Sequence, residues 1–228
     1  MSKPVEVTSE ILVEGQARVY SSHVVYTVEH PIAQHALLLL RSVDAYPSRF
    51  RRLAERLSLV ITVDATRDLP TEPHTVTTPL EKTTGRRLVG DVVVIPVLRA
   101  GLIMADVVLD VLPDARVGHI GLQRDEQTAV ASRYYLKVPA INPSTVVLVV
   151  DPMLATGGSA IAALDLIKAH GAVDVRLLSI VAAPEGIAAV HARHPDVAIF
   201  TAAVDRELND QKYILPGLGD FGDRLYGT

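Results

Sequence analysis

Runs of consecutive apolar, mostly β-branched residues recur through the second half of this 228-residue chain, and segments with helical periodicity lie between them. Strands that are apolar on both faces are typical of parallel sheets, because helices cover both sides of such a sheet. The predicted strands are residues 92–98, 117–122, 146–150, 175–181 and 197–203, and the predicted helices are residues 102–111, 159–170 and 184–193. The alternation predicts an α/β fold in which a parallel sheet is flanked by helices.

The first third of the chain has a different pattern. Residues 31–41 and 48–64 have the periodicity of helices, and residues 76–88, which contain Thr, Pro and Gly, indicate an extended hairpin arm. The sequence has no Gly/Ser-rich linker and no internal repeat. We therefore expect a single domain over residues 30–228, preceded by an N-terminal extension, residues 1–29, to which the sequence assigns no role.

Composition and charge argue against several classes of protein. Without cysteine the chain has no disulfide, no thiolate zinc site and no cysteine nucleophile, which favours a cytoplasmic location. The apolar runs fall far short of the roughly 20 residues that cross a bilayer, so no membrane partner is expected. A net charge of −4, no basic stripe and 4% aromatic residues disfavour nucleic acid as a partner. The histidines are scattered, so we expect no metal site built by the protein itself.

A strand, a loop of small residues and a helix follow one another from Val146 to His170, and this segment carries the clearest chemical signal. The main-chain N–H groups from Thr156 to Ser159 can converge on a phosphate at the positive end of the helix, and Gly lets the anion approach closely. Asp151, at the end of the strand, can accept hydrogen bonds from sugar hydroxyls. The alternative is a strand-to-helix turn that needs Gly for its geometry alone. The loop matches neither the dinucleotide fingerprint nor the Gly-Lys-Ser/Thr loop of nucleoside triphosphatases.

This loop, DPMLATGGS at residues 151–159, resembles the phosphoribosyl-diphosphate loop of uracil phosphoribosyltransferases. Three further stretches resemble motifs of the same family: PVLRAGL at residues 96–102, VAAPEGI at 181–187 and YILPGLGDFGDR at 213–224. The resemblance spans about residues 30–228 and implies the type I phosphoribosyltransferase fold. It also implies an enzyme of pyrimidine salvage, which transfers the 5-phosphoribosyl group from 5-phospho-α-D-ribose 1-diphosphate (PRPP) to N1 of uracil, giving UMP and diphosphate.

The resemblance also assigns site residues to this chain. The residues implied to bind PRPP are Arg99, Arg124, Asp151, Pro152, Met153, Leu154, Ala155, Thr156, Gly157, Gly158, Ser159 and Asp220. The residues implied to bind uracil are Ile214, Gly219, Asp220 and Phe221. Asp220 and Arg124 are the implied catalytic residues, and Arg99 and Arg124 would stabilise the departing diphosphate.

The sequence departs from the family pattern in two places. The loop around Arg124 resembles YRDEET, but Gln123 replaces the aromatic residue and Gln127 replaces a carboxylate, which bears on loop closure rather than on chemistry. Without the resemblance, this loop is equally well interpreted as a solvated connection. Pro152 takes the place of the second of two adjacent acids found in many type I relatives, so only Asp151 is left to hold the ribose hydroxyls.

The cofactor and the partners are implied by the same resemblance. It implies Mg²⁺ carried on the diphosphate of the substrate, and a homodimer or larger homo-oligomer to which the hairpin arm contributes. GTP is a candidate effector because relatives respond to it, although no residue here indicates it. Two other interpretations stay open. One is a regulator that binds uridine nucleotides and controls RNA without turnover, which the lack of a basic face disfavours; the other is a phosphoribosyltransferase for another base, which the C-terminal motif disfavours.

Overall fold

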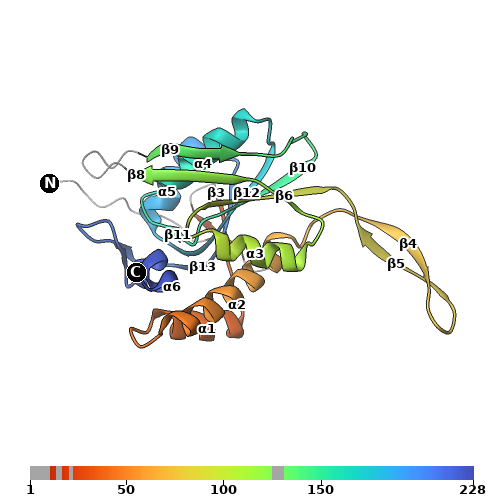
Figure 1. Cartoon of the computed structure of the whole chain (residues 1–228), viewed down its shortest axis with the longest axis horizontal. Helices are drawn as coiled ribbons and strands as arrows, with labels where there is room; N and C mark the ends of the chain where they lie inside the picture. The colour runs from red at the N-terminus through yellow and green to blue at the C-terminus, as the bar shows by residue number, and fades with distance from the viewer. Residues whose placement is uncertain (1–10, 14–16, 21–22, 125–130) are drawn as a thin grey trace.

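The computed structural model describes residues 11–13, 17–20, 23–124 and 131–228. The centre of the molecule is a sheet with the strand order β1-β2-β3-β13-β12-β10-β6-β8-β9, in which β7 also pairs with β6 and β11 with β12 (Figure 1). Its strands are β1 Ile11–Val13, β2 Ala17–Tyr20, β3 His23–Thr27, β6 Asp91–Leu98, β7 Arg116–Val117, β8 His119–Arg124, β9 Ala131–Lys137, β10 Thr145–Val150, β11 Met153–Leu154, β12 Asp174–Ala182 and β13 Ala198–Val204. The helices are α1 Pro31–Arg41, α2 Pro47–Ala65, α3 Leu102–Val111, α4 Gly158–Ala169, α5 Pro184–Arg193 and α6 Phe221–Tyr226.

Parallel pairing in the middle of the sheet confirms the fold class that the apolar runs predict. β10 lies between β6 and β12, with Leu148 opposite Val94 on one side and opposite Arg176 on the other, and β12 also pairs with β13. All six residues of β10 are buried, which explains its unbroken apolar sequence. The strand predicted at residues 117–122 is divided at Gly118 into β7 and β8, and both parts pair with β6.

Helices pack on both faces of the sheet and enclose two apolar cores (Figure 1). α1, α2 and α3 cover one face, where Phe50, Leu57 and Met104 are fully buried. α4 and α5 cover the other, where Leu164 and Ile167 are fully buried. Proline at the first position of α1, α2 and α5 fixes the backbone angle with which each of these helices begins.

A two-stranded arm extends from the body of the molecule (Figure 1). It consists of β4 Thr71–Thr77 and β5 Lys82–Leu88, which pair with each other in antiparallel register from Thr71 opposite Leu88 to Thr77 opposite Lys82. Every residue of β5 is exposed. The predicted hairpin arm is therefore present, but it begins at Thr71 rather than at residue 76, because a strand of mostly polar and exposed residues lacks the apolar alternation that marks a strand in a sequence.

The described part of the predicted N-terminal extension adds strands to the edge of the sheet. β3 runs parallel to β13, with Val25 opposite Ile199, and β1 and β2 continue the sheet in antiparallel register. Val25 is fully buried in the core on the α4 side. At the other edge, β9 pairs antiparallel with β8. Neither edge was predicted as strand, because the apolar runs in these segments, such as ILV at residues 11–13, are too short to indicate a strand.

Candidate active site

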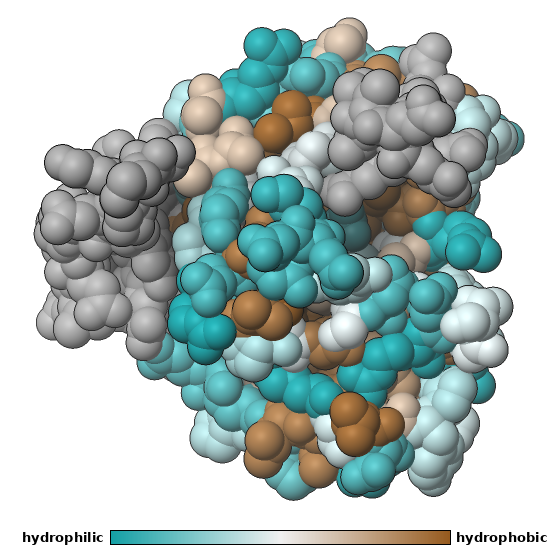
Figure 2. Space-filling model, turned by 90° about the vertical axis from the view of Figure 1, so that its left-hand side faces the viewer, coloured by the Kyte–Doolittle hydropathy of each residue, from teal (hydrophilic) through white to brown (hydrophobic). Residues whose placement is uncertain are grey.

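The carboxyl ends of the parallel strands meet at one edge of the sheet, which is where open α/β sheets bind ligands. Arg99 follows β6, Asp151 follows β10 and Asp205 follows β13. β11 and α6 lie at this end of the molecule (Figure 1). Figure 2 faces the same end, where hydrophilic residues run across the visible surface and apolar residues form small separate areas.

The loop after β10 places main-chain N–H groups at the start of α4. Gly157 has a left-handed backbone (φ 82°) and its carbonyl accepts the first hydrogen bond of the helix, from Ile161 N at 2.8 Å. A Cβ on Gly157 would lie 3.0 Å from the carbonyl oxygen of Gly186, whereas a Cβ on Gly158 would meet open space, with Thr156 Oγ1 nearest at 3.8 Å. The predicted phosphate cradle, residues 156–159, therefore has space for an anion beside Gly158, whereas at Gly157 it packs against Gly186.

The start of α5 supports the back of this loop. A Cβ on Gly186 would collide with the carbonyl oxygen of Ala155 and lie 2.8 Å from that of Leu154. Leu154 O accepts a hydrogen bond from Ala183 N at 2.8 Å, so the loop is also bonded to the end of β12. The VAAPEGI motif therefore carries Gly186 because the backbone of the predicted PRPP loop passes directly against it.

Two adjoining cavities bring the predicted base site and the predicted PRPP loop together. The larger, of about 280 Å³, is lined by Met153, Ala155, Gln211, Lys212, Tyr213, Ile214, Gly219, Asp220 and Phe221. The smaller, of about 30 Å³, is lined by Asp151, Met153, Leu154, Ala155, Gly157, Ser159 and Ala160. Met153 and Ala155 line both. All the predicted uracil-binding residues thus lie on one cavity, directly beside the loop predicted to hold the phosphoribosyl group.

The C-terminal segment from Ile214 to Phe221 lines the larger cavity while its large apolar side chains belong to the core. Ile214 and Phe221 are 4% and 2% exposed, and the ring of Phe221 packs edge-on against Phe50 with centroids 5.1 Å apart. Gly217 and Gly219 have positive φ angles of 57° and 81°. With the two large side chains in the core, main-chain donors and acceptors are what this segment can offer to a planar base.

Asp220 has a structural contact that its predicted chemical role does not require. Its Oδ1 accepts a hydrogen bond from Asp223 N at 2.9 Å and so caps the N-terminus of α6. Asp220 is exposed at the rim of the cavity, and capping engages only one of its carboxylate oxygens. The residue can therefore hold α6 and still direct a carboxylate oxygen towards a substrate.

Of the two predicted diphosphate-binding arginines, Arg99 has a described side chain and Arg124 does not. Arg99 is exposed just beyond β6, with its guanidinium carbon 5.9 Å from the ring centre of Tyr226. The Tyr226 hydroxyl donates to the main-chain oxygen of Arg99 at 3.2 Å. Arg124 is the last residue of β8, but its side chain and that of Gln123 are not described, and Gln127 lies outside the described residues.

The sequence analysis did not identify the three polar side chains that bind the backbone of the C-terminal segment, those of Arg41, Asp205 and Arg224. Arg41 and Asp205 bond to the backbone of Gly217, and Arg224 donates to the carbonyl of Leu218 at 2.6 Å. Burial lowers the pKa of Arg224. Arg41 and Asp205 are 164 residues apart in the chain, so no local spacing could have indicated the pair.

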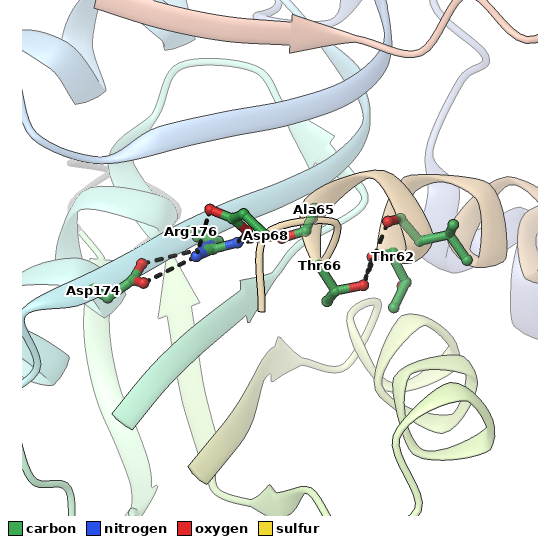
Figure 3. Close-up of polar contacts among 7 residues, drawn as sticks. Thr62, Ala65, Thr66, Asp68, Asp174 and Arg176 are labelled. Atoms are coloured by element: carbon green, nitrogen blue, oxygen red, sulfur yellow. Dashed lines mark hydrogen bonds and ion pairs between the residues drawn. The ribbon is translucent and has the colours of Figure 1, made fainter. Parts of the chain in front are cut away.

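A second polar cluster lies at the opposite end of the sheet (Figure 3). Arg176, near the start of β12, bonds to the carboxylates of Asp174 and Asp68 and donates to the carbonyl of Ala65 at the end of α2, at 2.6 Å. Burial opposes the charge of Arg176, but the hydrogen bonds that it donates to both carboxylates outweigh burial and raise the pKa of the guanidinium. This cluster joins α2 to the sheet far from both cavities.

The described residues contain no group of three or more His, Asp or Glu side chains arranged to hold a metal ion. None of the described helices is both long and apolar enough to cross a membrane.

Comparison with known proteins gives consistent matches along the chain. The family model described as uracil phosphoribosyltransferase matches residues 27–228. The uracil phosphoribosyltransferase of Thermosipho africanus is 50% identical over 202 residues, which cover 88% of this chain and 97% of the relative. That of Rhodococcus jostii is 48% identical over 205 residues, covering 90% and 98%.

Solved structures agree at the level of the fold. The AQ2163 protein from Aquifex aeolicus has a TM-score of 0.84 and 35% sequence identity, covering 90% of this chain and 98% of that one. Adenine phosphoribosyltransferase from Trypanosoma brucei, at 16% identity and a TM-score of 0.54, covers 86% of this chain and 88% of that one, and shares the fold. The predicted type I phosphoribosyltransferase fold is therefore confirmed. With a family model matching all but the first 26 residues and relatives about half identical in sequence, the chain belongs to the uracil phosphoribosyltransferase family.

Proposed function

We propose that this protein transfers the 5-phosphoribosyl group from PRPP to N1 of uracil, producing UMP and diphosphate for pyrimidine salvage. One observation carries the proposal: the cavity formed by the C-terminal segment adjoins the loop at the start of α4, and Met153 and Ala155 line both. A base in the larger cavity and a sugar phosphate on the loop would be neighbours, as a transfer between them requires.

In this proposal the loop and the two arginines hold PRPP. The N–H groups from Thr156 to Ser159 would bind the 5′-phosphate at the N-terminus of α4, in the space that a Cβ on Gly158 would occupy. Asp151 accepts hydrogen bonds from the ribose hydroxyls. Arg99 and Arg124, at the ends of β6 and β8, bind the diphosphate and stabilise the charge that it gains as it leaves.

The C-terminal segment reads the base through its backbone. Uracil offers N3–H as a donor and O4 as an acceptor, which main-chain groups of Ile214, Gly219 and Phe221 can match. Cytosine reverses this pattern at its exocyclic amine and would leave buried groups unpaired, which costs more than a weak contact does. The arrangement therefore supports selection of uracil over cytosine.

The reaction we propose is a displacement at C1′ of the ribose. The bond from C1′ to the diphosphate oxygen breaks, the bond from C1′ to N1 forms on the opposite side, and the N1 proton departs. The carboxylates of Asp151 and Asp220 stabilise the positive charge that develops on the sugar. Asp220, with one oxygen engaged in capping α6, uses the other to accept the N1 proton.

Mg²⁺ enters as part of the substrate, bound to the diphosphate of PRPP. Mg²⁺ prefers oxygen ligands, and the diphosphate of PRPP offers them. When bound, the ion neutralises the charge of the diphosphate. Arg99 approaches the same group from the protein side.

The test is an assay of UMP formation from PRPP and uracil, with cytosine, hypoxanthine and orotate offered separately. Product from uracil alone supports the proposal. Product from another base instead would show a different phosphoribosyltransferase, and tight UMP binding without any turnover would show a nucleotide-binding regulator.

We further propose a homodimer or larger homo-oligomer that uses the arm, with GTP as an effector. Three apolar side chains of the arm, Val76, Leu80 and Leu88, are 48%, 95% and 52% exposed, which is costly for a free surface and favours a covering partner. Sedimentation of the protein with and without residues 71–88 tests the assembly, and GTP titration of the UMP-forming rate tests the effector. A cytoplasmic location remains a prediction.

A further inference from the structure

An arginine and an aspartate that line neither cavity bind the main-chain N–H and C=O of one residue, Gly217, in the C-terminal segment proposed to read the base. We propose that Arg41 and Asp205 are positioning residues, which fix the backbone around Gly217 and thereby set the affinity for uracil without touching the base. This inference rests on the proposed function, because it assigns uracil to the cavity beside that segment.

Both polar groups of Gly217 are held. Arg41 Nη1 donates to Gly217 O at 2.6 Å and to Asp205 Oδ2 at 2.7 Å, while Nη2 donates to Asp205 Oδ1 at 2.6 Å. Asp205 Oδ2 in turn accepts from Gly217 N at 2.9 Å. The three residues thus form a closed ring of charge-assisted hydrogen bonds, which we call the Gly217 clamp.

Both side chains of the clamp come from well-packed parts of the fold, the end of β13 and the end of α1. The Asp205 side chain is 5% exposed, and Asp205 N donates to Ala182 O at 2.8 Å at the end of β12. Arg41 is the last residue of α1 and its side chain is 21% exposed. A planar guanidinium can bind a carboxylate with two nitrogens and still donate to a carbonyl, which an ammonium group cannot do in the same geometry.

Little regular secondary structure surrounds Gly217. It lies between the two-residue strand β15 (Ile214–Leu215) and α6 with a left-handed backbone, and a Cβ there would overlap the carbonyl oxygen of Ile214. Ile214 on one side of it and Gly219 on the other both line the larger cavity. A shift of the peptide at Gly217 would therefore move both walls of the base site, and misplacement by about 1 Å can cost on the order of 100-fold in catalysis.

The loop predicted to hold PRPP is fixed by different contacts. It packs against Gly186 and bonds to Ala183, on α5 and β12. Neither Arg41 nor Asp205 lines either cavity. Because this segment contributes only Asp220 to the predicted PRPP site, loss of the clamp should weaken binding of the base much more than binding of PRPP. General loss of stability would not produce that separation.

The experiment compares steady-state kinetics of the full chain with Arg41→Met, Arg41→Lys and Asp205→Asn. We expect the KM for uracil to rise about 10- to 100-fold in Arg41→Met, while the KM for PRPP changes by less than about threefold. Arg41→Lys should restore only part of the affinity, because the lysine cannot bond to the carboxylate and the carbonyl together. Asp205→Asn keeps an acceptor for Gly217 N and should have a smaller effect than Arg41→Met.

Arg176→Met is the matched control. Arg176, like Arg41, pairs with carboxylates and donates to a main-chain oxygen, but it does so at the opposite end of the sheet (Figure 3). We expect Arg176→Met to lower the unfolding temperature and leave both KM values unchanged. If Arg41→Met raises the two KM values in parallel, or raises neither, the proposal is wrong.

Amide hydrogen exchange separates failure of this inference from failure of the proposed function. Exchange across residues 214–221 should be faster in Arg41→Met than in the unchanged protein, and unchanged in Arg176→Met, whether or not uracil is the substrate. Absence of UMP formation by the unchanged protein would overturn the proposed function. Unaltered exchange in Arg41→Met would overturn the clamp, and Arg41→Lys or Asp205→Asn gives the same readout should Arg41→Met not fold.

Discussion

At the residue scale, two adjacent glycines in the loop after β10 meet different constraints. Gly157 needs its left-handed backbone, and any side chain would press on Gly186. Gly158 has no such strain, and its missing side chain faces open space. The first glycine is required by the fold, whereas the second is required only if an anion comes to the loop.

Replacing Gly158 with Val tests the phosphate cradle directly. We expect Gly158→Val to fold with an unchanged unfolding temperature, because the site is open and Val is no worse than Gly in a helix, and to lose measurable PRPP binding by calorimetry. Gly157→Val, by contrast, should lower the unfolding temperature because of its φ of 82°. Normal PRPP affinity in Gly158→Val would refute the cradle.

Two substitutions separate the capping role of Asp220 from its proposed catalytic role. Asp220→Asn keeps the oxygen that caps α6, so the unfolding temperature should hold while turnover falls by about 100-fold or more. Asp220→Ala should lose the same turnover and, in addition, about 1 kcal/mol of stability as the cap is removed. The measurements are UMP formation and thermal unfolding, and near-normal turnover of Asp220→Asn would remove the carboxylate from the mechanism.

The limits of sequence-based reasoning are clearest among these residues. Asp151 could be named from the residues alone, because it ends a buried strand and precedes a loop of small residues. Gly219 could be named only through the resemblance of its motif to a known family. The structure places the two residues on adjoining cavities. Arg41 could not, because its importance depends on Gly217, 176 residues further along the chain. Long-range contacts of this kind leave no periodic or local signature in the sequence.

At the scale of elements, α5 packs directly against the PRPP loop through Gly186. Gly186→Ala should push the two apart, lowering stability by about 1–3 kcal/mol, as overpacking does, and raising the KM for PRPP more than the KM for uracil. Ala188→Ser, on the exposed side of the same helix, is the control and should change neither. Wild-type stability in Gly186→Ala would contradict the packing described.

Strands of the sheet interior and helices with one apolar face were predicted well, whereas exposed edge strands were not. The bounds of α1, α3 and α5 agree with the prediction, because an apolar face repeats clearly at helical spacing and Pro marks the start of α1 and α5. β9 contains Ser132, Arg133 and Lys137, and so lacks the apolar run of a central strand. The first strand of the arm is likewise polar and exposed, which is why the arm was predicted too short.

At the scale of the whole molecule, the two ends of the sheet have different tasks. The carboxyl end holds both cavities, whereas the amino end holds ion pairs that join neighbouring elements. There, Arg116 Nε donates to Asp91 Oδ1 at 2.9 Å, and Thr145 Oγ1 donates to Asp91 Oδ2 at 2.7 Å. These bonds connect β6, β7 and β10 where each strand begins.

This end of the sheet should be sensitive to acid. The Arg116 hydrogen bond, helped by Thr145 and opposed by burial, holds the pKa of Asp91 below its ordinary 3.8. The folded state therefore favours the carboxylate, so its stabilisation is present above pH 3.8 and is lost as the pH falls through the lower folded value. We expect Asp91→Asn to unfold at lower urea concentration at neutral pH, with the difference shrinking below pH 3.8. Exposed Asp106→Asn is the control, and a difference independent of pH would contradict this assignment.

The ring around Gly217 also fixes the order in which the molecule can be completed during synthesis. Arg41 leaves the ribosome long before Asp205 and Gly217 have been translated, since 164 and 176 residues separate them from it. A nascent polypeptide can build α1, α2 and much of the sheet while its guanidinium still lacks both acceptors. The larger cavity is therefore among the last features to form, and an incomplete nascent chain cannot bind a nucleobase there.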